Sequence, residues 1–284
     1  MKTVTFKSIV YGALGRLGQQ PELSAPSAAT IAQQAQYIQT RIREAWEFAF
    51  WPELMEIEQR AYRDAYAAGT TYALDAEVYN AADEKYYISL QAANTGNDPA
   101  TETAWWEEQT DLDRYVAYAQ TGQTEIGSVE FASTRNPRKS TYPGYLSFFT
   151  SNNGIQLTSL APALVWLQFR PPVPLYSGVA YAAGTTYAAD DVRYLASTGE
   201  CYRSLAAANT GNDPATATAW WVKVDFPSLL APAVTQGVYA DGLVEDRQQT
   251  KARAQQGFYV ELQRIHSVVF AQQGQVPMAQ VQGY

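Results

Sequence analysis

The side chains that most often carry enzymatic chemistry are scarce in this chain of 284 residues, which holds one histidine, His266, and one cysteine, Cys201. A nucleophile needs a base within reach, and neither residue has an evident partner in the sequence. His266 falls in an expected helix, where a surface or interface position is typical. Cys201 has no evident activating neighbour and is expected to be a small buried residue. Such counts are too low for a cysteine-rich or histidine-based metal centre.

Paired carboxylates are the next candidates for chemistry. Asp83 and Glu84 are adjacent in the segment "YNAADEKYY". Glycoside hydrolysis needs two carboxylates on opposite sides of a cleft, whereas neighbours on one turn are usually solvated. No phosphate-binding loop of the form GxxxxGK or GxGxxG is present. We therefore expect no enzyme, with no catalytic residue, no cofactor and no metal.

Charge and hydropathy restrict the remaining classes. The chain has 20 basic and 28 acidic residues, a formal charge of −8, which argues against a broad surface for nucleic acid or anionic membrane. Three basic residues, Arg135, Arg138 and Lys139, share one expected loop; a solvated turn is the favoured interpretation, and contact with DNA or a partner is the alternative. No apolar run reaches the length of about 18 residues that a membrane span needs, and the N-terminus lacks an apolar signal core. We expect a soluble protein without an export signal.

A repeat dominates the sequence. The stretch "AANTGNDPAT" occurs at residues 92–101 and 207–216, and "AWW" follows it at 104–106 and 219–221. Residues 65–106 and 180–221 are identical at 29 of 42 positions, all at an offset of 115. This is a duplicated module. Gly96 and Gly211, each followed by Asn, are expected in turns with positive φ.

Each module is too small to fold easily without a disulfide or a metal, so its aromatic residues are expected to supply a core. The segments "GTTYALDAEVY…KYYISLQAANTGNDPATETAWW" and "GTTYAADDVRY…CYRSLAAANTGNDPATATAWW" resemble the chitin-binding modules of carbohydrate-binding families 5 and 12. The resemblance implies that a surface indole stacks on a sugar ring. It departs from a strict repeat where Cys201 stands in place of Tyr86, and a decorative or packing role is the alternative. The residues implied are Trp106 and Trp221, with Trp105 and Trp220 as core or partner, and Tyr72 and Tyr187 as weaker candidates.

Helical periodicity marks both ends of the chain. The spacing predicts a helix over 6–18 and a long helix after Ser27, with an apolar row at Ile31, Ala35, Ile38, Ile42, Trp46 and Phe50. These two helices are expected to form a hairpin. A helix starting near Pro227 and a longer one over 241–272 are expected at the other end. The longer helix has an apolar stripe of Phe258, Leu262, Ile265 and Val269, and the tail after it shows no periodicity.

Between the modules the sequence predicts strands at 115–119, 125–133, 145–150, 154–158 and 163–170, separated by turn signals. Residues 171–178, "PPVPLYSG", are expected to form a stiff linker. The predicted fold class is α+β, with terminal helices in a bundle, a central antiparallel β domain and two small all-β inserted modules. The expected domains are 1–61 (helical hairpin), 62–110 (first module), 111–176 (central β region), 177–224 (second module) and 225–284 (closing helices and tail).

The sequence outside the modules carries a second resemblance. "IVYGALGRLGQQPE", "ATIAQQAQYIQTRIREAWEFAFWPE" and "GVYADGLVEDRQQTKARAQQGFYVELQRI" are similar to the terminal helices of head-to-tail adaptor (connector) proteins of tailed phages. "YPGYLSFFTSNNGIQLTSLAPALVWLQFRPPVP" fits their middle domain more loosely. The resemblance implies a virion protein that is assembled in the host cytoplasm and joins head to tail as a ring of about twelve copies, a dodecamer. It implies a portal protein and a tail or nozzle protein as partners, and DNA only in transit through the lumen.

Other classes remain as alternatives. A non-catalytic carbohydrate-binding accessory protein would use the helices only to support two sugar sites, and host-surface glycan would then be its partner. A hydrolase fragment with chitin-binding appendages would need an acid–base pair in a catalytic domain. A tail fibre would show coiled-coil heptads, and none occur in the sequence.

Overall fold

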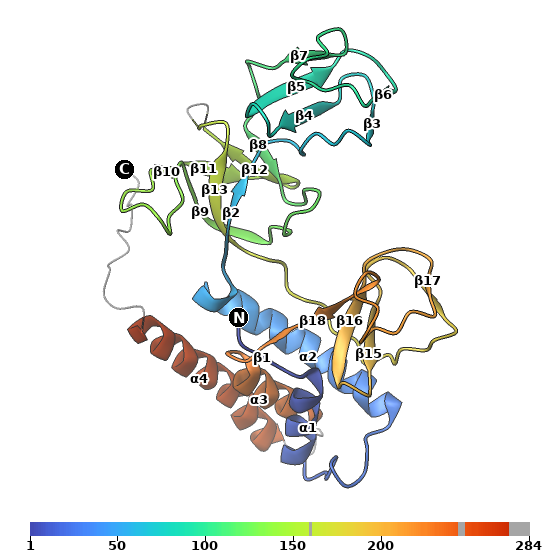
Figure 1. The fold of residues 1–284 in the computed structure, drawn as a ribbon. Coiled ribbons are helices and arrows are strands. Elements are labelled where there is room, and N and C mark those ends of the chain that lie inside the picture. Colours follow the sequence, from blue (N-terminus) through green and yellow to red (C-terminus); the bar gives the residue numbers. More distant parts are fainter. Residues whose placement is uncertain (159–160, 244–247, 273–284) are drawn as a thin grey trace. The chain divides into compact units, whose positions relative to one another are not determined.

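The computed structural model describes residues 1–158, 161–243 and 248–272. The chain forms two compact units (Figure 1). The first combines Met1–Leu54 with the chain from Val173 onwards, and the second is Met55–Pro172. The fold is mixed α+β, and its strands lie in small antiparallel sheets, as predicted. The structure therefore groups the second module with the helices and the first module with the central strands.

Four helices form the core of the first unit: α1 (Phe6–Arg16), α2 (Ala28–Phe48), α3 (Ala231–Gly242) and α4 (Gln248–Gln272). Side-chain caps fix where α1 and α2 begin, because Thr5 and Ser27 each accept a hydrogen bond from the backbone N–H three residues later. The predicted start at Ser27 is confirmed. None of the described helices combines the length and apolar character needed to cross a bilayer.

Helix α3 lies at the centre of this unit. It contacts α1, α2 and α4, whereas α1 and α2 make few contacts with each other. The two helices of the predicted hairpin therefore share one core mainly through α3, because the apolar faces of both meet it. An ion pair joins α2 to α3: Nε of Arg41 lies 2.8 Å from Oδ2 of Asp241.

The core of this unit contains most of the predicted apolar rows. Ala35, Ile38, Ile42 and Trp46 are buried, while Phe50 follows α2 and is exposed. The predicted stripe on α4 is confirmed, with three residues buried and Val269 packed against the same core. Tyr176 is also buried there, so the predicted linker 171–178 is in part a packed segment without secondary structure.

Two predicted helix boundaries near the C-terminus are wrong. Pro227 does not begin a helix: β19 (Phe226–Pro227) pairs with β1 (Thr3–Val4), and α3 begins at Ala231 with Pro232 in its first turn. The single helix predicted over 241–272 is instead the end of α3 and the whole of α4. Residues 244–247 and the tail from 273 onwards lie outside the described residues.

The second unit contains two antiparallel sheets besides the first module. One has the order β10-β9-β13-β2 and the other β11-β12-β8. Four of the predicted strands between the modules are confirmed. The one predicted at 145–150 is instead two strands, β10 and β11, in different sheets, and β2 was not predicted. Val116, Ala132, Ile155 and Leu167 belong to their shared core. The strands are β2 (Glu56–Arg60), β8 (Tyr115–Ala117), β9 (Ser128–Ser133), β10 (Tyr145–Leu146), β11 (Phe148–Thr150), β12 (Gly154–Leu157) and β13 (Val165–Arg170).

The two modules repeat the same strands at the same offset. The first has β3 (Thr71–Tyr72), β4 (Glu77–Asn80), β5 (Lys85–Ser89), β6 (Asn94–Thr95) and β7 (Trp106–Glu108). The second has β14 (Thr186–Tyr187), β15 (Val192–Leu195), β16 (Glu200–Ser204), β17 (Asn209–Thr210) and β18 (Trp221–Val224). Each forms a three-stranded sheet and a two-stranded one. Gly96 and Gly211 adopt positive φ angles of 76° and 74°, as predicted.

Each module shows two faces of one hairpin. Val78 and Tyr87 pair across β4–β5 and form the first module's own core with Trp106. Tyr79 and Tyr86, the next pair, point to the opposite face and pack into the core of the central sheets. In the second module Tyr194 and Cys201 hold the matching positions and pack into the helical core. Tyr86 and Cys201 therefore differ at the position where the first module packs on the central sheets and the second module packs on the helices.

Candidate glycan-binding surface of the modules

The second tryptophan of each pair is a core residue. Trp106 and Trp221 are each 2 % exposed. Their indole N–H groups donate to the carbonyl oxygens of Asn97, at 2.9 Å, and Asn212, at 3.0 Å. A ring held on all sides and hydrogen-bonded inside the module has no face left for a sugar. The prediction that these two residues offer the stacking surface is therefore wrong.

The tyrosine candidates belong to the same clusters. The ring of Tyr72 meets Trp106 edge-on at a centroid distance of 5.3 Å, and Tyr187 meets Trp221 in the same way at 5.2 Å. Tyr187 is buried and Tyr72 is half-buried. Each hydroxyl accepts a hydrogen bond from a backbone N–H five residues earlier in the chain. These contacts make both tyrosines parts of the module core, as expected of aromatic residues in a small domain.

The asparagines of the repeated decapeptide hold the turn that precedes the tryptophans. Asn94 is fully buried and donates from Nδ2 to Oγ of Ser89 at 2.9 Å and to the carbonyl of Trp105. Asn97 in turn donates to Oδ1 of Asn94 at 2.8 Å. The second module repeats these contacts through Asn209, Ser204 and Asn212. A buried polar network thus explains why these residues are identical in the two modules, since each side chain satisfies a hydrogen-bonding group of another.

The first tryptophan of each pair is the one that reaches the surface. Trp220 is 36 % exposed, and Trp105 is half-buried against the module core. The backbone N–H of Leu90 donates to the carbonyl of Trp105 at 2.9 Å, and Leu205 donates to that of Trp220 at the same distance. Both leucines are exposed. Each module therefore displays an indole beside a leucine, which we define as the indole–leucine surface.

The residues next to this surface differ between the modules. In the first, Ile88 pairs with the exposed carboxylate of Glu107 on the adjacent strand. In the second, Arg203 pairs with Val222 and forms an ion pair of 2.7 Å with Asp190. An indole face can stack on the C–H face of a pyranose, and polar groups at the edge of the indole can bind the hydroxyl groups of the sugar. Sequence reasoning assigned the two indoles of each pair in reverse, because adjacent tryptophans give no sign of which one points inward.

The other candidate groups are not brought together. Cys201 is fully buried, burial raises the pKa of its thiol to about 12, and its Sγ donates to the carbonyl of Ser177. Asp83 accepts from the hydroxyl of Tyr87 at 2.6 Å, and burial together with this carboxylate raises the pKa of that tyrosine. Glu84 is exposed. His266 contacts the rings of Trp51 and Phe270. Within residues 1–158, 161–243 and 248–272, no cluster of three possible metal ligands occurs.

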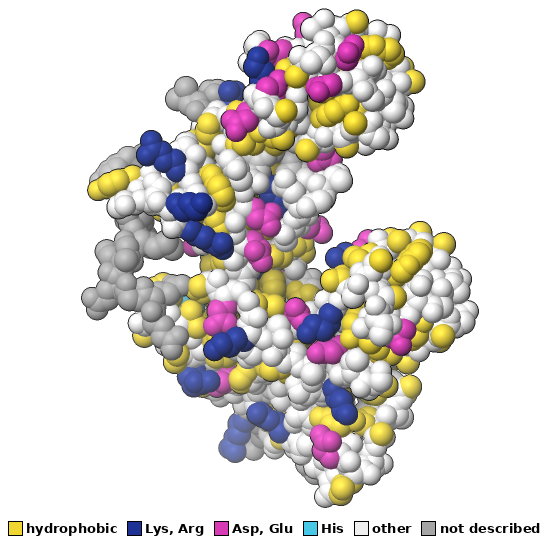
Figure 2. Space-filling model, viewed as in Figure 1, with side chains coloured by type: hydrophobic (Ala, Val, Ile, Leu, Met, Phe, Trp, Pro, Cys, Tyr) yellow, Lys and Arg dark blue, Asp and Glu magenta, His cyan; other side chains and the backbone are white. Residues whose placement is uncertain are grey.

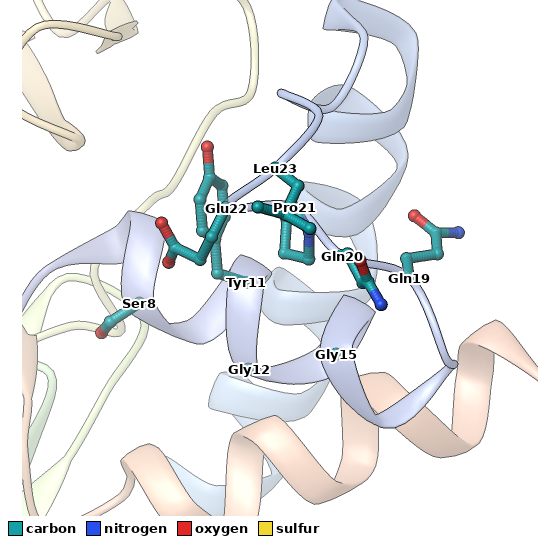
Figure 3. Close-up of a pocket in the computed structure, with 9 residues that line it drawn as sticks. All are labelled: Ser8, Tyr11, Gly12, Gly15, Gln19, Gln20, Pro21, Glu22 and Leu23. Atoms are coloured by element: carbon teal, nitrogen blue, oxygen red, sulfur yellow. The ribbon is translucent and has the colours of Figure 1, made fainter.

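One open cleft lies beside α1, with a volume of about 530 Å³ (Figure 3). Its walls are the face of α1 that carries Tyr11, Gly12 and Gly15, and the loop of residues 19–23. Glu22 is its only carboxylate, and the hydroxyl of Ser8 at its edge donates to the carbonyl of Thr5. This arrangement offers no pair of nucleophile and base.

Comparison with known proteins assigns no family to the chain: no family model matches it, and no curated protein matches its sequence. The indole–leucine surfaces therefore stand on their geometry and on their occurrence in both modules.

Proposed function

We propose that this protein is a non-catalytic structural adaptor of a tailed-phage virion, forming a ring between the portal and the tail. The observation that carries the proposal is the set of exposed apolar residues on α4, a helix whose other side is already buried. Phe258, Leu262 and Ile265 of α4 are buried in the helical core. Val260 and Val268 lie elsewhere on the same helix and are exposed, Val260 to 54 %. Exposed apolar side chains on a helix whose other side is already buried offer surface to bury against another subunit.

The arrangement of the helical unit also supports this function. Its core is built from both ends of the chain, because α1 and α2 meet α3 and α4. Phe48, Phe50 and Phe270 add exposed aromatic surface near the ends of α2 and α4. Exposed aromatic and aliphatic residues of this kind are typical of the buried centres of subunit interfaces. Head-to-tail contacts between identical copies close into a ring when the rotation between neighbours permits. In the proposed neck, the portal and a tail or nozzle protein lie on the two sides of the ring, and DNA passes through its lumen.

The modules add a second role to this proposal. We infer that their indole–leucine surfaces bind a glycan of the host surface, through Trp105 in the first module and Trp220 in the second. Each surface is small, so each contact is weak. A ring multiplies the number of such surfaces, and linked weak sites gain affinity through effective concentration.

A carbohydrate-binding accessory protein is the second candidate, and one observation favours it: the indole and the leucine recur in both copies. The adaptor buries the exposed apolar residues of α4 between subunits, whereas the accessory protein leaves them in solvent. The test compares the wild type with Val260→Lys by light scattering, with Gln36→Lys as a control that adds the same charge at an exposed position of α2. The adaptor predicts an oligomer that only Val260→Lys disrupts. A wild type that stays monomeric, alone and with a portal protein, and that is retained on chitin contradicts the adaptor and favours the accessory protein.

A further inference from the structure

Charge is unevenly distributed along this acidic chain. Residues 131–189 contain no aspartate and no glutamate, although the chain as a whole has 28 acidic residues. The same stretch contains Arg135, Arg138 and Lys139, all in the loop of the β9–β10 hairpin. This hairpin belongs to the second unit, and Figure 2 shows Lys and Arg side chains gathered over it. A concentration of positive charge in an acidic protein needs an explanation beyond solubility.

The hairpin loop presents these charges on an ordered backbone. The N–H of Thr134 donates to the carbonyl of Gly144 at 2.9 Å, and that of Arg135 donates to Pro143 at 3.0 Å. Gly144 adopts a positive φ of 69°, which glycine accepts without strain. Arg135, Arg138 and Lys139 are exposed, and within the described part of the chain none of them forms an ion pair.

Exposed aromatic residues accompany the charges. Tyr142 in the same loop is 82 % exposed, and Tyr145 at the start of β10 is also exposed. The ring of Tyr145 meets Phe131 of β9 edge-on at a centroid distance of 5.2 Å, which fixes its position on the hairpin. Tyrosine and arginine are the residues most enriched where protein partners meet. The basic hairpin therefore has the composition of a docking surface.

The first module has the complementary charge, and the second does not. Residues 62–110 contain nine acidic and two basic residues, a net charge of −7, whereas residues 177–224 contain four acidic and three basic residues, a net charge of −1. Figure 2 shows Asp and Glu side chains over the first module. Glu84, Glu102 and Glu107 are exposed and form no ion pair among the described residues. The matching positions of the second module hold Gly199, Ala217 and Val222.

We infer that the basic hairpin of one copy docks on the acidic first module of a second copy. The inference rests on the proposed ring, because a hairpin that meets a different surface of its neighbour gives the head-to-tail contact that a ring requires. Opposite charges steer the two surfaces together and fix their register. A nucleic acid is the less favoured partner, because three cations on a chain of charge −8 give a weak field for phosphates.

The second module provides a matched way to test this contact. Glu84→Gly, Glu102→Ala and Glu107→Val install in the first module the residues that the second module carries at the same positions. The fold accepts these residues, because the second module has the same strands. We expect the triple variant to need about tenfold more protein for half-assembly, since several charge contacts are lost together. Glu22→Gln with Glu53→Gln is a control at exposed carboxylates of the first unit.

A charge exchange separates a direct contact from a general charge effect. Arg135→Glu with Arg138→Glu, and Glu102→Lys with Glu107→Lys, should each weaken assembly as measured by light scattering. The chain that carries all four substitutions should assemble as the wild type does, because each docking surface again meets its opposite. A mixture of the two double variants should form mixed pairs that neither forms alone, which distinguishes contact between copies from contact within one chain.

The outcomes separate this inference from the proposed function. A ring that forms equally well in every variant overturns the docking of hairpin on module and leaves the adaptor in place. Weakening by both double variants without recovery in the fourfold variant also overturns it. A wild type that stays monomeric at every salt and protein concentration, alone and with a portal protein, contradicts both. Recovery in the fourfold variant, with assembly of the wild type weakened at high salt, is the expected result.

Discussion

At the scale of single residues, the two tryptophans of each module have different roles. Trp221→Ala removes a buried indole and one of the two donors to the carbonyl of Asn212, the other being the hydroxyl of Tyr181. We therefore expect the free energy of unfolding of the second module to fall by about 3–5 kcal/mol. Trp220→Ala removes a partly exposed ring and should cost about 1 kcal/mol or less. Hydrogen exchange of the amides within the module, measured at increasing urea concentration, gives both changes in the free energy of unfolding.

The same pair of variants tests the glycan surface. Trp220→Ala combined with Trp105→Ala should abolish retention on chitin while the far-UV circular dichroism stays that of the wild type. Retention that survives in this folded double variant contradicts the assignment. Trp221→Ala should lose retention only in proportion to the unfolding of its module.

Cys201 provides a test of the contact between the second module and the helices. Its thiol has a pKa raised to about 12 from 9.0 by burial, so at neutral pH the thiolate population falls about a thousandfold. We expect a thiol-specific reagent to modify the native protein at least that much more slowly than the protein in urea. Rapid modification of the native protein means that the module detaches from the helical core.

At the scale of elements, the packing of α3 depends on a glycine. A Cβ atom at Gly237 would lie 2.7 Å from Cδ of Arg41 and 3.0 Å from Cδ2 of Phe258. Arg41 has little freedom to move away, because Asp241 and Glu44 bind its guanidinium and hold the pKa of Arg41 above its usual value. Gly237→Ala should therefore lower the free energy of unfolding by about 1–3 kcal/mol. Thermal unfolding of the variant measures the loss.

A matched control exists on α1. A Cβ atom at Gly15 would meet nothing within 4 Å, and alanine favours a helix over glycine. Gly15→Ala should leave the protein unchanged or stabilise it by up to about 1 kcal/mol. Equal destabilisation by the two substitutions would mean that α3 does not lie against α2 and α4 as described.

The elements also show how far the sequence alone leads. Ser27 and the apolar rows predicted where α2 begins and which side of α4 is buried, because capping and periodicity are local properties. The strand β2, "EIEQR", escaped prediction because it is rich in charged residues and is half-buried only through pairing with β13. Pro227 was misjudged because its pairing partner, Thr3, lies at the other end of the chain. Long-range pairing decides such cases, and local patterns do not report it.

The candidate site shows the same division. The sequence alone predicted the repeat and its aromatic core. It did not predict which tryptophan of each pair points into the core and which reaches the surface. The buried network of Asn94, Ser89 and Asn97 determines which indole enters the core. That network forms only when β3 and β6 pair and the turn at Gly96 closes.

At the scale of the whole molecule, three surfaces act in one proposed assembly. The exposed face of α4 packs between subunits, the basic hairpin docks on the acidic module, and the indole–leucine surfaces stay outward for glycan. Substitution of Val260, of Arg135 with Arg138, or of Trp220 removes one of these surfaces and leaves the other two intact, whereas Glu107 adjoins the indole–leucine surface of the first module. The proposal therefore predicts separable losses: of assembly for the first two surfaces, and of chitin retention for the third.

The most direct test of the proposed ring is the mass of the purified wild-type protein by light scattering, with negative-stain images of the same sample. The account predicts a closed ring of about twelve copies, formed by the protein alone or after a portal protein is added. A monomer that forms no ring in either condition would contradict it.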